Sequence, residues 1–374
     1  MNIVHIFAAY PNKYQPYNTE FINELNKIGY NNKVFSFSLN GGLDSKTTYL
    51  FNNPSKYKMI YNFIFDFYRL LKYKKYSEQT IGEALTNFTR YKPLLYYFNY
   101  FFHIHHIQII DKKFLSFLKC FKIAYSVSIR GSDVAINVIQ NPNFNQNLSL
   151  ALSNTKSIHA VSNDLAMKLK SFTRNENIFI IPRYIVYDEN RNISKKSNET
   201  TQILTVGRYH WVKGYNYILE TLCRLKKDKI EFNYTICGDG SVEETKQLNY
   251  LVELYGLSNQ VDLVGFVDHQ VISSYYKSTD IYLCGSIYEG MPNAVINALN
   301  YNIPIVATSV GGIPEIITDG INGLLCLPAD SQDMKKKLLQ IINKDYFFEI
   351  CSDSQISNSK NILSKYLDFY KNKI

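Results

Sequence analysis

Short apolar runs alternate with longer amphipathic stretches along this chain. Residues 3–8 predict a buried strand, residues 19–28 the helix after it, and residues 33–38 the next strand. Gly29, a residue that tolerates a left-handed backbone, ends the helix between them. Repeated strand–helix–strand units of this kind build parallel sheets with helices on both faces. The pattern therefore predicts an α/β chain with doubly wound sheets.

The same alternation continues to the C-terminal region. Further strands are expected at residues 101–110, 123–129, 157–161, 202–206, 231–237, 261–264, 281–284, 305–307 and 323–326. Helices are expected at residues 215–225, 243–255, 271–276 and 293–300. A length of 374 residues is more than one ordinary core needs. The polar stretch DENRNISKKSNETT, residues 188–201, is the predicted linker between two such domains.

Composition narrows the class of protein without identifying it. The net charge of +9 suits anionic partners such as nucleotides or phospholipids, but the basic residues are dispersed and no nucleic-acid motif is present. The six cysteines show no regular spacing, which indicates reduced thiols in a cytoplasmic protein. No uncharged apolar run reaches the roughly 18 residues of a membrane span.

The turn GRYHWVKG, residues 207–214, joins an expected strand to an expected helix. Arg208 and Lys213 therefore lie beside a helix N-terminus, where the backbone N–H groups already favour an anion. Two cations can neutralise a diphosphate, although a solvated basic turn is the simpler alternative. No Asp-x-Asp pair occurs in the sequence, so a metal is not expected to supply this charge.

Two further strand ends carry small or charged residues. In CGDGS, Gly238 permits close approach of a ligand or simply makes the turn, and Asp239 can cap the next helix. In SIYEGMPN, Gly290 permits a tight turn and places Glu289 at the edge of a cleft, where sugar hydroxyls are suitable donors. The helix after this turn begins near Pro292, and the N–H groups of residues 291–294, which include Met291 and Asn293, face the same volume.

These motifs occur in a familiar order. VGRYHWVKG, ICGDGS, VDLVGFV, SIYEGMPNAVINAL and PIVATSVGGIPEIITDGINGLL resemble the group 1 glycosyltransferases, glycosyltransferase family 4, from residue 202 to about residue 330. The first half is similar more loosely, through IHH, SIRGSDV and HAVSNDL. The tail NILSKYLDFYKNKI resembles the family's last helix, which crosses back onto the first domain.

The resemblance implies a GT-B architecture, in which two doubly wound Rossmann-like domains face each other across a cleft. The expected parts are an acceptor-side domain at residues 1–187, the linker 188–201, a nucleotide-sugar domain at residues 202–355 and the returning helix at residues 356–374. It also implies a nucleotide-sugar donor, no cofactor, no metal, and transfer with retention to a glycan or lipid-linked glycan. The donor-binding residues implied are Arg208, Lys213, Gly238, Gly290, Met291, Pro292, Asn293 and Asn297. The catalytic residues implied are Glu289, Arg130 and His105.

Two positions depart from the family pattern. Asn297 replaces the second glutamate of E-x7-E, which grips the ribose diol, and the loss of a charge-assisted bond predicts donor binding weaker by about tenfold. In SIRGSDV, Arg130 stands where family members often carry histidine. Arginine cannot act as a base but can hold a negative charge. Asp133 either orients Arg130 or caps the next helix.

The segment FFHIHHIQII contains His103, His105 and His106, with no further metal ligands nearby. His105 is the favoured contact for the acceptor or the donor sugar, and a packed structural histidine is the alternative. Residues 56–76 and 90–102 mix aromatic and basic residues. Helices of this composition either lie peripherally on an anionic membrane or pack within the first domain.

The leading hypothesis is a cytoplasmic, retaining hexosyltransferase in bacterial surface polysaccharide biosynthesis. A non-catalytic nucleotide-sugar-binding subunit is the alternative suggested by Asn297 and Arg130. A nucleotide-sugar epimerase is a third possibility, but the chain lacks the acid and histidine set of that class.

Overall fold

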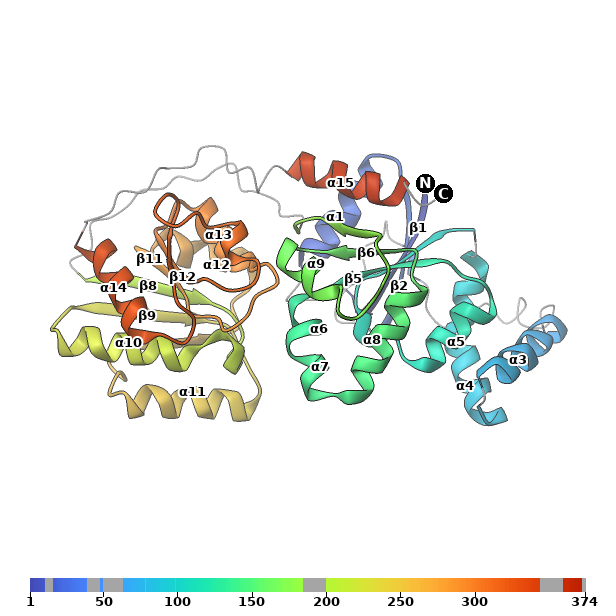
Figure 1. The fold of residues 1–374 in the computed structure, drawn as a ribbon, viewed down its shortest axis with the longest axis horizontal. Coiled ribbons are helices and arrows are strands. Elements are labelled where there is room, and N and C mark those ends of the chain that lie inside the picture. The colour runs from blue at the N-terminus through green and yellow to red at the C-terminus, as the bar shows by residue number, and fades with distance from the viewer. Residues whose placement is uncertain are drawn as a thin grey trace. The chain divides into compact units, whose positions relative to one another are not determined.

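A computed structural model describes residues 1–10, 16–38, 48–49, 63–77, 79–97, 99–183, 200–343 and 359–371. The chain divides into two compact units (Figure 1). Unit 1 comprises Met1–Val161, Ala166–Tyr184 and Leu363–Ile374, and unit 2 comprises Ser162–Leu165 and Ile185–Ile362. The predicted linker, residues 188–201, lies almost entirely outside the described residues.

Unit 1 is built on a seven-stranded sheet in the order β3-β2-β1-β4-β5-β6-β7, and its neighbouring strands pair in parallel. The strands are β1 (Asn2–Ala9), β2 (Asn31–Ser38), β3 (Thr48–Tyr49), β4 (Phe101–Ile104), β5 (Tyr125–Ile129), β6 (Ser157–Ala160) and β7 (Ile178–Ile180). The apolar faces of β1 and β2 form part of the core with α1, through Phe7, Ile22 and Val34. The parallel sheet predicted from the alternating pattern is confirmed in this unit.

The helices of the first half of the chain surround this sheet. They are α1 (Pro16–Lys27), α3 (Phe63–Ser77), α4 (Ile81–Tyr91), η1 (Lys92–Tyr97), η2 (Ile107–Ile109), α5 (Lys112–Cys120), α6 (Gly131–Ala135), α7 (Asn137–Gln140), α8 (Pro142–Asn154) and α9 (Asn163–Leu169). Helix α1 ends as predicted, because Gly29 adopts a φ of +88°. Helix α4 begins with a capping box between Thr80 and Glu83.

The last helix, α15 (Ser359–Lys371), contributes its end to unit 1. Its aromatic side chains pack on the sheet and on α1: Tyr366 lies 4.5 Å from Phe21, and Phe369 lies 5.3 Å from Phe179, measured between ring centroids. Aromatic pairs at these distances stabilise the contact beyond simple burial. The C-terminal helix therefore completes the core of unit 1.

The expected strand at residues 101–110 is too long. Strand β4 ends at Ile104, and the chain then turns into η2. The backbone N–H of His105 still donates to the carbonyl of Ile6, but the N–H of Ala8 donates to the His106 ring at 3.3 Å. A side chain thus replaces the next rung of the ladder, and the strand stops. Strand β7 was not predicted, because three residues are too few to show a period.

Unit 2 is built on a six-stranded sheet in the order β10-β9-β8-β11-β12-β13, also parallel between neighbours. Its strands are β8 (Thr201–Val206), β9 (Phe232–Cys237), β10 (Val261–Gly265), β11 (Ile281–Cys284), β12 (Ile305–Thr308) and β13 (Leu324–Cys326). Its helices are η3 (Trp211–Lys213), α10 (Tyr215–Lys227), α11 (Val242–Leu254), α12 (His269–Lys277), α13 (Asn293–Asn300), η4 (Ile313–Glu315) and α14 (Ser331–Ile342). All six strands predicted for this half are present, within two residues at each end.

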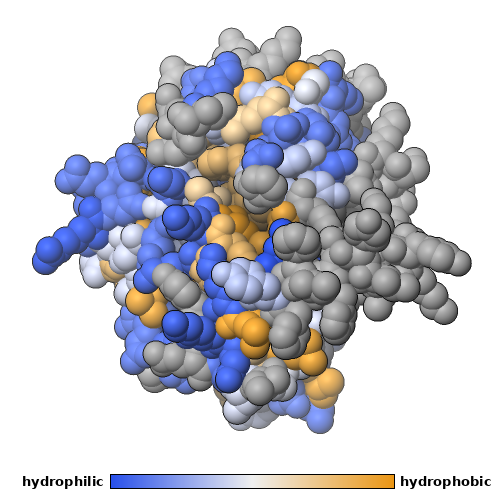
Figure 2. Space-filling model, turned by 90° about the vertical axis from the view of Figure 1, so that its right-hand side faces the viewer, coloured by the Kyte–Doolittle hydropathy of each residue, from blue (hydrophilic) through white to orange (hydrophobic). Residues whose placement is uncertain are grey.

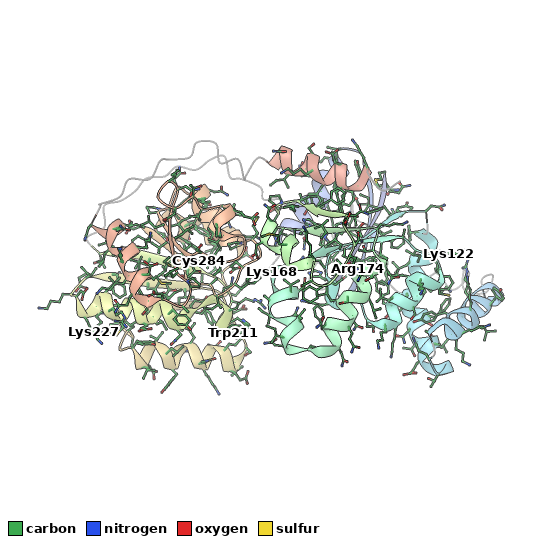
Figure 3. All side chains as sticks on the ribbon, viewed as in Figure 1. Lys122, Lys168, Arg174, Trp211, Lys227 and Cys284 are labelled. Carbon is green, nitrogen blue, oxygen red and sulfur yellow. The ribbon has the colours of Figure 1, made fainter. Side chains whose placement is uncertain are left out.

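Buried residues of β8, β9 and β11 pack with α10 and α14 into one core. Cys284 lies inside this unit, and Trp211 lies at its surface (Figure 3). The five described cysteines, Cys120, Cys223, Cys237, Cys284 and Cys326, are free thiols. None of the described helices combines the length and the apolar character needed to cross a membrane.

Both sheets reverse their strand order beside their first strand. In unit 1 the reversal lies between β1 and β4, and in unit 2 it lies between β8 and β11. Parallel sheets bind ligands at such a switch point, outside the carboxyl ends of the strands. A ligand site is therefore expected at each of the two reversals.

Candidate functional site

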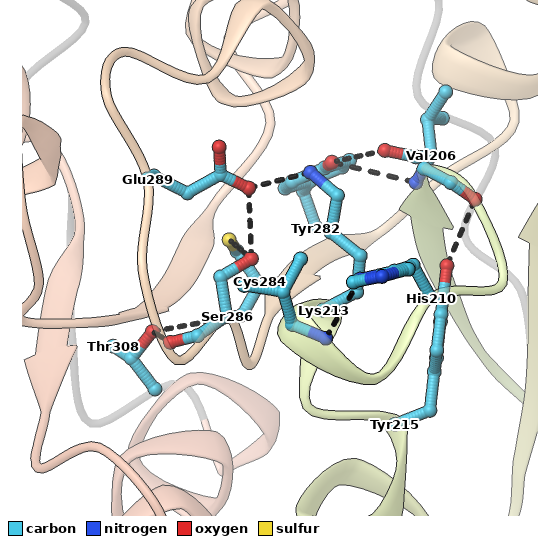
Figure 4. A network of polar contacts seen from close by, with 11 residues as sticks. Val206, His210, Lys213, Tyr215, Tyr282, Cys284, Ser286, Glu289 and Thr308 are labelled. Atoms are coloured by element: carbon cyan, nitrogen blue, oxygen red, sulfur yellow. Dashed lines mark hydrogen bonds and ion pairs between the residues drawn. The ribbon is translucent and has the colours of Figure 1, made fainter. Parts of the chain in front are cut away.

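An ion pair lies at the switch point of unit 2. Lys213, in the turn after β8, places Nζ 2.5 Å from Oε1 of Glu289, in the loop after β11 (Figure 4). The hydroxyl of Ser286 donates to the same carboxylate oxygen at 2.9 Å. The two charged side chains are 22% and 13% exposed, respectively, so the pair is largely withdrawn from water but still reachable. Two residues assigned separate ligand roles from the sequence thus meet directly.

Backbone and side-chain bonds hold the two loops together. The N–H of Ile287 donates to the carbonyl of Val212 at 2.8 Å, which ties the loop after β11 to the turn after β8. The hydroxyl of Thr308 donates to the carbonyl of Ser286 at 2.6 Å (Figure 4). Lys213 and Glu289 are therefore positioned by neighbouring strand ends and not by one flexible loop.

Glycines allow the backbones at this site to approach one another. A Cβ on Gly214, which has a φ of +66°, would lie 1.9 Å from the carbonyl oxygen of Gly285. A Cβ on Gly238 would lie 1.9 Å from the carbonyl oxygen of Gly207. Neither distance is possible for a real side chain. Gly238 thus serves the close packing of two turns, which is the simpler of the two interpretations offered by the sequence.

Helix α13 begins beside Glu289, with Met291 buried and Pro292 as its N-cap residue. Pro292 makes no side-chain cap, and Gly290 lies two residues before it in the loop. The side-chain carbonyl of Asn293 is buried and has no hydrogen-bond partner among the described residues. An uncapped helix start and an unsatisfied acceptor leave polar groups at this end that a ligand can satisfy.

Asn297 lies on the same helix, and its side chain hydrogen-bonds the buried hydroxyl of Tyr276. That hydroxyl also donates to the carbonyl of Ala294 at 3.3 Å. The amide at this position is therefore partly engaged within unit 2.

His210, which lies between Arg208 and Lys213 in the turn, was not predicted from the sequence as a site residue. Burial lowers the pKa of His210, and the positive charges of Arg208 and Lys213 lower it further, whereas Glu244 raises it. The charges of both cations therefore act on one imidazole in this turn. The position of His210 between two basic residues was the feature of the sequence that could have indicated a site residue. Arg208 itself is exposed.

Asp239, which the sequence allowed as a cap, does not cap the next helix. Helix α11 is capped by Ser241, whose hydroxyl accepts the N–H of Glu244 while the Glu244 carboxylate accepts the N–H of Ser241. The carbonyl of Asp239 accepts the N–H of Tyr209 at 2.9 Å, which ties Asp239 to the turn after β8. The serine therefore takes the capping position.

Comparison with known proteins gives two results. Residues 186–360 match the family of Glycosyl transferases group 1. Solved structures cover the whole length: the lipopolysaccharide outer core galactosyltransferase WaaB (TM-score 0.69, 15% identity, 100% of both chains) and HepE from Anabaena in complex with UDP and glucose (TM-score 0.75, 14% identity, 99% of both chains). The chain has the GT-B fold.

The sequence relatives of this GT-B chain match it over only part of their own length. An uncharacterized glycosyltransferase of Haemophilus influenzae is 29% identical over 48% of this chain and 50% of that protein. The amylovoran biosynthesis glycosyltransferase AmsK of Erwinia amylovora is 32% identical over 38% of this chain and 36% of that protein. The putative colanic acid biosynthesis glycosyltransferase WcaL of Salmonella typhimurium is 29% identical over 39% of this chain and 37% of that protein. The chain thus spans between half and three fifths of the first curated relatives.

The first unit of the GT-B fold contains the remaining predicted residues, His105 and Arg130. His105 follows β4, Arg130 follows β5, and both line a pocket of unit 1. The Asp133 carboxylate accepts the backbone N–H of Arg130 at 2.8 Å, so it caps helix α6. His103 is fully buried and bonds Ser128 at 2.7 Å, which makes it a structural histidine.

No group of three or more histidine, cysteine, aspartate or glutamate side chains in the described ranges is arranged to hold a metal ion. The clustered histidines bond to one another and to hydroxyl or amide groups instead.

Proposed function

We propose that this chain is a retaining, metal-independent glycosyltransferase that moves a sugar from a nucleotide-sugar to a glycan acceptor in surface polysaccharide assembly. The observation that carries the proposal is the Lys213–Glu289 ion pair at the β8/β11 switch point, beside the uncapped start of α13. The matches to glycosyltransferases named for colanic acid and amylovoran biosynthesis support the substrate class.

The roles follow from the charges at the site. Arg208 and Lys213 neutralise the diphosphate, and the N–H groups at the start of α13 bind its oxygens. Glu289 accepts hydrogen bonds from the hydroxyls of the donor sugar. As the acceptor oxygen bonds to the anomeric carbon, the bond from that carbon to the diphosphate breaks, and the acceptor proton passes to the departing phosphate oxygen. No second base is needed for this proton balance.

Donor turnover without acceptor tests the proposal. Nucleotide release from UDP-, GDP- and dTDP-sugars is measured for the unmodified chain and for Lys213→Ala, Glu289→Ala and Lys227→Ala. The control, Lys227, is an exposed lysine in the last turn of α10 (Figure 3). We expect slow release of one nucleotide that Lys213→Ala and Glu289→Ala abolish and that Lys227→Ala leaves unchanged. Release that persists in all three variants would remove the basis of the proposal.

A non-catalytic nucleotide-sugar-binding subunit is the second candidate, because the Asn297 amide is engaged by Tyr276 in place of a free carboxylate. The same assay separates the two functions. Tight nucleotide binding with no release and no transfer, over the whole donor panel, would favour the binding subunit.

Peripheral contact with the cytoplasmic face of a membrane is part of the proposal, since it would bring a lipid-linked acceptor to the enzyme. Tyr68 and Leu71 of α3 are 70% and 47% exposed, and Lys72 beside them is exposed as well. Apolar surface is visible among hydrophilic surface on the side of the molecule that carries α3 (Figure 2). Tyr73 of the same helix, however, is buried against Phe117 of α5, so α3 also serves packing.

A further inference from the structure

The pocket of unit 1 lies at its own switch point, outside the carboxyl ends of the strands. The cavity itself is small, about 30 Å³, and it opens to solvent, so a ligand larger than a few atoms would lie at its mouth. Its lining residues are Asn18, Phe21, His105, Ser128, Ile129, Arg130, His159, Val161, Arg183 and Tyr366. The lining contains two guanidinium groups and no carboxylate, so its formal charge is positive.

A chain of hydrogen bonds fixes the tautomer of His105. The amide nitrogen of Asn32 donates to Asn26 and to the carbonyl of Tyr30, so its Oδ1 is the acceptor for His5 Nε2 at 3.0 Å. The other nitrogen of a neutral His5, Nδ1, must then accept from His105 Nε2 at 2.9 Å. It follows that Nδ1 of His105 carries a lone pair.

Burial keeps these rings neutral. It lowers the pKa of His5 to about 4 and holds the pKa of His105 well below its usual range, with the neighbouring histidines adding to the effect on His105. His105 is also clamped between aromatic rings, stacked 4.3 Å from both Phe7 and His103. A fixed, neutral imidazole with a lone pair accepts a hydrogen bond and does not donate one through that atom.

A second chain runs along the other side of the pocket. His159 Nε2 lies 2.7 Å from the carbonyl of Ile181 and is therefore the protonated nitrogen. Its Nδ1 accepts from the Ser128 hydroxyl at 2.8 Å, and Ser128 accepts from His103 Nε2 at 2.7 Å. Consistent with this direction, Nδ1 of His103 has no partner among the described residues. His159 is thus committed to the fold, and His105 is the histidine of the pocket with a lone pair to offer.

Arg130 and Arg183 both line this pocket. The positive charges of Arg130 and Arg183 both act on His106 and on His159, where they add to burial in lowering the pKa. Arg130 follows β5 and Arg183 follows β7, so the two charges come from different strand ends. The buried carboxylate of Asp133 accepts hydrogen bonds from the backbone of Arg130 and from Gln108, and it does not line the pocket.

We infer that this pocket binds an anionic sugar, with a carboxylate or phosphate between Arg130 and Arg183 and a hydroxyl donated to Nδ1 of His105. Under the proposed function, on which this assignment rests, the ligand is the acceptor. Arginine pairs with either anion through a planar fork of donors. The hydroxyl held by His105 would be oriented by a neutral acceptor.

Isothermal titration of the full chain without donor tests the assignment. The probes are hexuronic acids and hexose 6-phosphates, each paired with the neutral hexose of the same configuration, and inorganic phosphate. We expect at least one anionic sugar to bind about tenfold or more tightly than its neutral partner, because a charge-assisted bond is added. Comparing the hexuronic acids with the hexose 6-phosphates shows whether a carboxylate or a phosphate is preferred.

Variants locate the site. Arg183→Gln is expected to weaken the preferred anionic sugar by about tenfold or more and to leave the neutral sugar unchanged. Arg174→Gln, which removes an exposed arginine of unit 1 that does not line the pocket, is the matched control (Figure 3). His105→Phe keeps an aromatic ring in the stack but removes the lone pair, and it should weaken the charged and the neutral sugar equally. Circular dichroism confirms that each variant is folded.

Three results would overturn the inference: no anionic sugar preferred over its neutral partner, inorganic phosphate bound as tightly as the best sugar phosphate, or displacement of the sugar by free nucleotide diphosphates. The nucleotide-release assay is independent of this titration. Sugar binding without donor turnover would refute the proposed function alone, and donor turnover without sugar binding would refute the pocket assignment alone.

Discussion

At the level of single residues, the candidate site of unit 2 is held by charged side chains that satisfy one another. Glu289 needs hydrogen-bond donors because only 13% of its side chain is exposed, and Lys213 and Ser286 supply them. A bound donor would therefore share Lys213 between its phosphates and Glu289. The pairing orients the lysine in the absence of ligand and lowers the cost of ordering it when the ligand arrives.

Replacing Asn297 with glutamate should tighten donor binding. The variant Asn297→Glu offers a carboxylate to the ribose diol and gives up the amide that donates to the Tyr276 hydroxyl, whose proton stays with the Ala294 carbonyl, so we expect the dissociation constant to fall about tenfold. Fluorescence of Trp211, the single tryptophan of the chain, reports binding because it lies in the turn with Lys213. Asn249→Glu adds the same charge at an exposed position of α11. Unchanged or weaker binding in Asn297→Glu would contradict a ribose contact here.

Among the structural elements, the turns at the strand ends explain why the site forms. Gly214 and Gly256 have nearly the same backbone, with φ of +66° and +65°, but different surroundings. A Cβ on Gly214 would strike the Gly285 carbonyl, whereas a Cβ on Gly256 meets nothing within 4 Å. The close packing of two turns, and not the left-handed backbone alone, distinguishes the glycine of the site.

The pair Gly214→Ala and Gly256→Ala separates these two effects. We expect Gly256→Ala to lower the free energy of unfolding by about 1 kcal/mol through backbone strain alone. Gly214→Ala should cost about 1–3 kcal/mol more, because the turn must move away from Gly285, and it should also weaken donor binding. Urea unfolding and Trp211 fluorescence measure the two quantities. Equal losses of stability in the two variants would contradict the close approach of Gly214 to the Gly285 carbonyl.

The buried histidines make the stability of unit 1 depend on pH. Burial lowers the pKa of His5 and of His159 to about 4, whereas an unfolded histidine titrates near 6.5. Between these values the unfolded chain binds more protons, so each histidine removes up to about 1.4 kcal/mol of stability per pH unit as the pH falls. The contribution is complete above pH 6.5 and is lost toward pH 4. Burial raises the pKa of Asp133, which opposes the trend at the acid end.

Hydrogen exchange measures this dependence strand by strand. The opening free energy of β1 and β6, which carry His5 and His159, should fall between pH 7 and pH 5, while that of β8 and β9, which carry no histidine, should change much less. A pH-independent opening of β1 and β6 would contradict the assignment of neutral, hydrogen-bonded histidines.

The sequence was sufficient for the strands of unit 2 because their apolar runs are fully buried and bounded by turn residues. It failed at residues 105–110, since only the His106 ring bonding Ala8 reveals where the ladder stops. The same limit applies to the site. Arg208, Lys213 and Glu289 could be named from the motifs, but the contact between Lys213 and Glu289 depends on the pairing of β8 with β11. Arg183 carried no sequence signal, because β7 is too short to predict.

Over the full chain, charge compensation by protein side chains predicts that catalysis needs no divalent ion. Nucleotide release should proceed at the same rate in excess EDTA and in magnesium or manganese, because Arg208, Lys213 and the start of α13 carry the charge of the departing diphosphate. The release assay in each buffer is the measurement. Activity lost in EDTA and restored by magnesium would refute the metal-independent mechanism.

The most direct measurement is a crystal structure of the full chain with the nucleotide-sugar preferred in the release assay. We predict that the diphosphate lies within hydrogen-bond distance of Lys213 Nζ and of the first N–H groups of α13, with the sugar hydroxyls on Glu289. A nucleotide bound elsewhere in the chain, with the Lys213–Glu289 pair unchanged and without contact to the ligand, would contradict the account.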